Sequence, residues 1–229
     1  MKKALLILSV LLVSMSYGQE VKQIPQINVS GEGKVKVIPD EAIIAATVAT
    51  KGNNAKDVKK QNDIKIEAVL KFIKKMNLAP ADYKTQQVSL NPQYDYEKKK
   101  HSYNATQTIE ILLRDLSKYD ELMEGLVDQG INRIDNVTFQ SSKLKQYESE
   151  ARKLAMKEAK MKAEDYVSVL KQKVGRAMTI SDNSQTYYPR PMYAAMKSME
   201  SSDMSAPRET LAVGEINITA NFTVSFILE

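Results

Sequence analysis

The stretch from Glu215 to Leu228, EINITANFTVSFIL, decides the fold class. Its apolar side chains alternate with Asn, Thr and Ser side chains, and this period of two is typical of a strand that buries one face. The segment is also long for a strand. We therefore expect a sheet with one packed face, in which this last strand is central or a major pairing partner.

Earlier segments predict the other strands. The first, from Ile27 to Val37, is expected to be interrupted at Gly31-Glu32-Gly33 and to form a hairpin with 42–50 across the Pro39-Asp40 turn. The glycines favour a β-bulge or a close backbone contact. The remaining strands are predicted at 83–97, 101–113, 131–141 and 177–181.

Three segments have helical periodicity instead. The first follows Gly52-Asn53-Asn54 and ends near Asn77, with Asn62 on its apolar face. The second covers 117–129, with Ser117 as its expected N-cap. The third and longest covers 143–173, ending before Gly175. Its apolar stripe contains four alanines, which let the helix lie close to whatever it covers: Ala151, Ala155, Ala159 and Ala163.

The predicted order is β-β-α-β-β-α-β-α-β-β, which indicates an α+β protein with largely antiparallel sheets covered by amphipathic helices. We expect one domain over residues 19–229, with residues 26–114 and 115–229 as candidate subdomains and 186–208 as a mobile loop.

The N-terminus predicts export. Lys2 and Lys3 precede a short apolar stretch from Ala4 to Val13, and small residues before Gln19 complete the pattern of a secretory signal peptide over residues 1–18. No later segment is apolar enough to cross a membrane. We therefore expect a periplasmic or envelope protein without a transmembrane segment after cleavage.

The composition argues against several kinds of protein. The chain has no cysteine, so disulfide scaffolding and thiolate metal sites are excluded. Its formal net charge is +5, which is a weak basic bias without the clustered motif of a nucleic-acid binder. We expect no nucleic-acid partner and no cofactor.

The sequence predicts no catalytic site. His101 is the only histidine and follows a lysine run at an expected hairpin turn, so an exposed imidazole is favoured over a catalytic one. Asp40-Glu41 follows a proline and suits a turn or cap role. Gly31-Glu32-Gly33 lacks the helix and the Lys-Ser/Thr pair of a phosphate loop. We therefore expect a non-enzymatic protein.

The 186–208 segment differs from the rest because it is rich in Pro, Ser, Tyr and Met. Thioethers suit Cu(I), pack adaptably at interfaces and can be oxidised. Three interpretations remain open: a loop with incidental methionines, a contact with another copy or an envelope protein partner, and a soft-metal site. The residues concerned are Met192, Met196, Met199 and Met204.

Several blocks resemble the SIMPL-domain family of YggE-like periplasmic proteins, in order along the chain. They are Val29 to Val35 with Pro39 to Ala42, Lys84 to Gln86 with Leu90 to Tyr96, Tyr103 to Ala105 with Arg114 to Leu116, Ala151 to Ala163, and Gly214 to Ile216. The resemblance implies an exported bacterial envelope protein that forms large ring-like or channel-like homo-oligomers and is associated with oxidative-stress tolerance. It implies no catalytic residues.

The leading hypothesis is thus a non-enzymatic envelope protein that self-assembles, because long strands leave edges that pair with other chains unless they are protected. The alternative is a ligand-binding or partner-binding module that uses loop 186–208, with copper or a protein as its partner.

Overall fold

The computed structural model describes residues 24–96, 99–184, 211 and 213–229. The predicted order of strands and helices is confirmed, with two short 3-10 helices added. The elements are β1 (Gln26–Val37), β2 (Glu41–Gly52), α2 (Ala55–Lys75), η2 (Pro80–Asp82), β3 (Tyr83–Asp95), β4 (Lys100–Leu113), η3 (Leu116–Lys118), α3 (Tyr119–Asp128), β5 (Arg133–Gln140), α4 (Leu144–Ser168), β6 (Val174–Asp182) and β7 (Ile216–Leu228).

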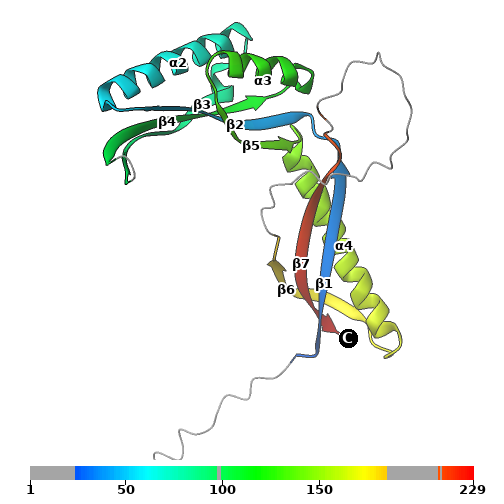
Figure 1. Ribbon diagram of the computed structural model, residues 1–229. Helices are drawn as coiled ribbons and strands as arrows, with labels where there is room; N and C mark the ends of the chain where they lie inside the picture. The colour runs from blue at the N-terminus through cyan, green and yellow to red at the C-terminus, as the bar shows by residue number, and fades with distance from the viewer. Residues whose placement is uncertain (1–23, 97–98, 185–210, 212) are drawn as a thin grey trace, which may run out of the picture.

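The strands form two antiparallel sheets, as Figure 1 shows. Sheet A has the order β1-β7-β6, and sheet B has the order β3-β4-β2-β5. α4 covers sheet A, whereas α2 and α3 cover sheet B, and we call each sheet with its helices lobe A and lobe B. The α+β class is confirmed, and so is the central position of β7, which pairs with β1 on one side and β6 on the other.

The predicted break in the first strand and its hairpin with the second are both wrong. β1 runs unbroken through the two glycines, with Gly31 opposite Phe222 and Gly33 opposite Ala220. β2 joins the other sheet, between β4 and β5. Alternating side chains indicate a strand but do not identify the strand it pairs with. The short connection through Pro39 therefore suggested a hairpin that does not form.

Sheet membership does not follow the two halves of the chain. Sheet A combines β1 from the first half with β6 and β7 from the second. Leu211 and Val213 pack against the core of sheet B, just before the chain enters sheet A as β7. Whether residues 26–114 and 115–229 behave as subdomains stays a prediction.

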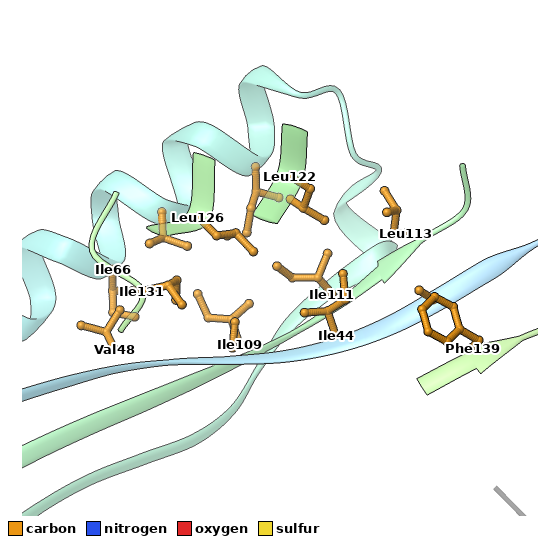
Figure 2. Close-up of a cluster of buried hydrophobic side chains, with 14 residues drawn as sticks. Ile44, Val48, Ile66, Ile109, Ile111, Leu113, Leu122, Leu126, Ile131 and Phe139 are labelled. Carbon is orange, nitrogen blue, oxygen red and sulfur yellow. The ribbon is translucent and has the colours of Figure 1, made fainter. Parts of the chain in front are cut away.

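The core of lobe B consists of large aliphatic side chains (Figure 2). Ile44, Ile109 and Ile111 from the sheet face Leu122 and Leu126 of α3, and all five are fully buried. The apolar stripe of α2 packs into the same core.

Two asparagines fix α2 in place. Its N-cap Asn54 accepts hydrogen bonds from the amides of Lys56 and Asp57 at 2.9 and 3.2 Å. The predicted place of Asn62 on the inner face is confirmed, because its amide nitrogen donates to the Val48 carbonyl at 3.0 Å. Such bonds offset the cost of burying a polar side chain.

The other helices differ at their ends from the prediction. Asp115, not Ser117, is the first capping residue: it accepts from the Ser117 amide at 3.1 Å, and the first turn is 3-10 rather than α. α4 ends at Ser168 rather than near Lys173, and Lys171 then takes a left-handed φ of 54°. Within the described residues, no helix is long and apolar enough to cross a bilayer.

Candidate functional site: an open strand edge

The two glycines of β1 bring α4 against the backbone of sheet A. A Cβ atom at Gly31 would lie 2.0 Å from the carbonyl oxygen of Ala155, and one at Gly33 would lie 1.9 Å from that of Ala151. No side chain fits at either place. The alanine stripe faces these glycines and is fully buried. Of the two predicted roles for the glycines, the close backbone contact is therefore the correct one.

This close packing places α4 beside the outer edge of β1, which among the described strands pairs with β7 alone. On the other side, the Glu32 amide donates a hydrogen bond to the Glu158 carboxylate. Lys162 donates to the Ser30 carbonyl at 3.1 Å and forms an ion pair with Glu158, also at 3.1 Å. Two helix side chains thus bind main-chain groups of β1 where a neighbouring strand would otherwise bind.

The carboxylate of this pair is held in its charged form. The hydrogen bond from the Glu32 amide, and then Lys162, keep the pKa of Glu158 below its ordinary value of 4.5. The pair is therefore present at neutral pH, where it protects part of the edge. A shallow pocket of about 210 Å³ lies here, lined by Ser30, Gly31, Glu32, Lys162, Asn183, Asn221, Phe222 and Thr223.

Apolar side chains continue the row of α4 that reaches the edge. Residues four apart lie on one helix face, so Leu154 and Tyr166 flank Glu158 and Lys162 along the same row. Leu154 is 41% exposed and Tyr166 is 57% exposed. We call these four residues the α4 ridge. Exposed apolar side chains at both ends of such a ridge, beside a strand edge without a paired strand, form a surface suited to another polypeptide.

β1 also differs from the end strands β3, β5 and β6. The pairing of β3 and of β5 each contains a register shift, and β3 also contains Pro92. The pairing of β6 contains two register shifts. Bulges and prolines hinder the addition of a further strand. The pairing of β1 with β7 runs without a shift from Gln26 to Val37, so β1 presents a regular edge.

A second polar cluster lies where the chain passes between the lobes. Arg114 donates to the buried carboxylates of Asp82, at 2.7 and 3.0 Å, and Glu41, at 2.9 Å. Its hydrogen bonds hold the pKa of Asp82 below the ordinary value. We call these three residues the junction cluster. Because both carboxylates are bound to the guanidinium, they are poorly placed for acid–base chemistry.

Asp40 has the turn role that the sequence predicts. Its carboxylate accepts from the amide and the hydroxyl of Ser142, at 2.7 and 2.6 Å, and so ties the β1–β2 connection to the β5–α4 connection. Burial raises the pKa of Asp40, but the bonds from Ser142 outweigh it, and the pKa lies below its ordinary value. Glu41 differs from the prediction, because it is buried against Arg114.

The structure also places His101. It is exposed, as predicted, and lies in β4 opposite Tyr94, with 4.8 Å between the ring centroids. Among the described residues, no three His, Asp or Glu side chains are grouped as a metal site would require. The four candidate methionines, Met192, Met196, Met199 and Met204, lie outside the described residues.

Sequence reasoning missed the α4 ridge and the junction cluster. Glu158 and Lys162 had the signature of an ordinary i, i+4 surface pair, and their reach to β1 depends on the close helix packing. Arg114, Asp82 and Glu41 are far apart in the chain, and no local pattern connects them.

Known proteins and one family model match this chain over most of its length. Residues 27–226 match the model of a family described as SIMPL, protein of unknown function (DUF541). The uncharacterized protein YggE of Escherichia coli strain K12 is 29% identical over 208 residues, which are 90% of this chain and 84% of that protein. YggE of Edwardsiella ictaluri is 27% identical over 186 residues, or 78% of each chain. The 26 kDa periplasmic immunogenic protein of Brucella melitensis is 24% identical over 219 residues, 92% of this chain and 87% of that protein.

Proposed function

Because the chain belongs to the SIMPL family, we propose that it works as an exported, non-enzymatic envelope protein that assembles with copies of itself. The family resemblance predicted from the sequence is confirmed. The family description assigns no function, and the names of these relatives describe no enzyme.

The first part of the proposed function is the compartment in which the protein works. The predicted location in the periplasm or cell envelope is confirmed by the Brucella melitensis relative, which is named a periplasmic protein. The signal peptide at residues 1–18 lies outside the described residues and stays a prediction, and cleavage before Gln19 is part of the proposal.

The observation that carries self-assembly is the regular free edge of β1 beside the α4 ridge. If two copies meet at this edge about a two-fold axis, their β1 strands run antiparallel and sheet A continues from one copy into the other. Both α4 helices then lie on the same face of the joined sheet. Leu154 and Tyr166 of each copy are placed to pack against the ridge of the other copy and to lose their exposed apolar area.

The experiment measures the mass of the mature protein, residues 19–229, by size-exclusion chromatography with light scattering. We expect an oligomer at micromolar concentration. Leu154→Ser with Tyr166→Ser should shift the mass toward the monomer. A matched control is Ile64→Ser with Val127→Ser, which changes two side chains of lobe B that are each 58% exposed. A monomeric wild type, or an equal shift in both variants, would contradict the proposal.

A second variant separates strand pairing from packing of the ridge alone. Glu158→Ala with Lys162→Ala releases the Glu32 amide and the Ser30 carbonyl, the two groups that these side chains bind. If the edge itself pairs, removing this protection should strengthen association, so the oligomer should persist at lower protein concentration. Weaker association would show that β1 does not pair directly.

A link to oxidative-stress tolerance is part of the proposal on the strength of the resemblance alone. The direct check is survival of a deletion strain exposed to hydrogen peroxide, with and without the wild-type gene. Equal survival of both would remove this part of the proposal.

The second candidate function is binding through segment 186–208, and its support is the group of four methionines there. Thioethers favour Cu(I) in an exported protein. Calorimetric titration with Cu(I) should show binding that is lost when Met192, Met196, Met199 and Met204 are all replaced by Leu. Equal weak binding by both proteins would leave only a protein partner for this segment, which a pull-down with and without the segment would detect.

A further inference from the structure

β3 and the end of its hairpin with β4 carry exposed apolar side chains that none of the described helices covers. α2 packs on β2 and β4, and β3 lies beyond it at the edge of sheet B. Along β3 and into the residue after it, four large side chains alternate onto one face of the strand. They are Val88, Leu90, Tyr94 and Tyr96, with exposed fractions of 65%, 40%, 40% and 84%. We call them the β3 stripe.

The aromatic side chains of this stripe contact one another rather than the core. The rings of Tyr94 and Tyr96 meet edge to face, with 5.0 Å between their centroids. Tyr94 also contacts the imidazole of His101 across the hairpin. This geometry supports the rings while leaving them open to solvent, where their apolar area is costly unless something covers it.

Basic side chains gather at the same end of lobe B. Lys99, just before β4, and Lys100, its first residue, are both exposed. The hairpin end thus combines exposed tyrosines with two exposed lysines, Lys99 and Lys100.

We propose that this hairpin end binds the surface of a lipid bilayer that contains anionic phospholipids. Tyrosine favours the bilayer interface, where its ring meets acyl chains and its hydroxyl meets water. Lysines beside it are attracted to the negative headgroups. The charge of the lysines therefore matches this partner, and the β3 stripe supplies the apolar area that would enter the interface.

This surface is separate from the one proposed for self-assembly. The β3 stripe belongs to sheet B, whereas the α4 ridge and β1 belong to lobe A. The two proposals can therefore fail independently. Binding through the hairpin end would hold the protein at a membrane face of its compartment without a membrane-spanning segment.

The chain contains no tryptophan, so Tyr96→Trp introduces a single reporter at the most exposed position of the stripe. We expect its fluorescence to shift to the blue with vesicles of equal parts phosphatidylcholine and phosphatidylglycerol, but much less with phosphatidylcholine alone. The unmodified mature protein should co-sediment with the anionic vesicles. Lys99→Gln and Lys100→Gln should each weaken this binding about fivefold, with less effect in high salt.

Tyr94→Ser with Tyr96→Ser should reduce co-sedimentation by about tenfold or more. Ile38→Ser with Met178→Ser is the matched control, since these side chains are 73% and 43% exposed and lie away from the hairpin; it should bind like wild type. Circular dichroism checks that each variant folds. Absence of binding to anionic vesicles, or equal binding by the tyrosine variant, overturns the proposal. A change in oligomer mass in the tyrosine variant also overturns it, because the stripe would then be a contact between copies.

Discussion

The two lobes cover an antiparallel sheet in different ways. In lobe A, three alanines of α4 lie directly on the glycine backbone of β1: Ala151, Ala155 and Ala159. In lobe B, α2 and α3 stand off from the sheet, and isoleucine, leucine and valine side chains fill the space between them. Alanine buries little apolar area, so lobe A depends on close contact between backbones, while lobe B depends on buried hydrocarbon volume. We therefore expect added side-chain atoms to destabilise lobe A most, and removed side-chain atoms to destabilise lobe B most.

The largest effect is expected from Gly33→Ala, which breaks the close packing of lobe A. Its Cβ would lie 1.9 Å from the carbonyl oxygen of Ala151, and a backbone atom cannot rotate away. We expect a loss of about 3 kcal/mol or more in the free energy of unfolding, measured by urea denaturation.

Gly125→Ala in lobe B is the matched control for that change. Its Cβ would also approach to 1.9 Å, but against the ring of Phe72, which is only partly buried and can move. Alanine also favours a helix over glycine by about 1 kcal/mol. An equal or larger loss in Gly125→Ala would show that the two lobes do not differ in this way.

The reverse experiment removes volume from lobe B. Ile111→Ala should cost about 3 kcal/mol, because Ile111 is fully buried between the sheet and α3 and its removal leaves a cavity. Ala159→Gly in lobe A removes much less volume and should cost only about 1 kcal/mol, mostly from helix propensity. Thermal or urea denaturation compares the two; a larger loss in Ala159→Gly would contradict the expected difference.

The junction cluster tests whether paired charges contribute to the stability of lobe B, because its three residues lie at the ends of β2, β3 and β4. Arg114→Ala leaves the buried carboxylates of Asp82 and Glu41 without their cation and should lower the free energy of unfolding at pH 7. The wild-type pKa of Asp82 is lowered from 3.8, so its stabilising contribution is present above that pH and is lost as the pH falls through the folded-state pKa.

The difference between Arg114→Ala and wild type should therefore shrink as the pH falls below about 4, because a protonated Asp82 carboxyl no longer needs the guanidinium. Urea denaturation at a series of pH values measures this. If the difference stays constant across the series, the side chain of Arg114 acts through packing and not through its charge.

The smallest effect concerns how the covering helices begin. Asn54→Ala removes the cap of α2 and should cost about 1 kcal/mol. Lys143→Ala at the start of α4 should change stability by less than about 0.5 kcal/mol, because Lys143 makes no side-chain cap. Urea denaturation measures both changes. Equal losses of stability in the two variants would mean that the Asn54 cap does not stabilise α2.

Much of lobe B and of the helices could be predicted from local patterns. The stripe of α2, including Asn62, and the alternation of β4 and β7 were visible in the residues. Gly31 and Gly33 also pointed to a close backbone contact, although not to α4 as the contacting helix. The candidate site could not be predicted, because the free edge of β1 exists only through the absence of a neighbouring strand, which no residue pattern records.

By itself, the sequence determined the order of the elements, their inner faces, the family and the absence of a cysteine-based site. These follow from side-chain periodicity and composition, which act over a few residues at a time. Only the tertiary structure decided that β1 pairs with β7 and not with β2, and that Arg114 binds Asp82 and Glu41. It also decided that, among the described residues, the outer edge of β1 has no paired strand and the β3 stripe stays exposed. The physical reason is that strand pairing and helix docking depend on contacts between residues far apart in the chain, and many pairings satisfy the same local pattern.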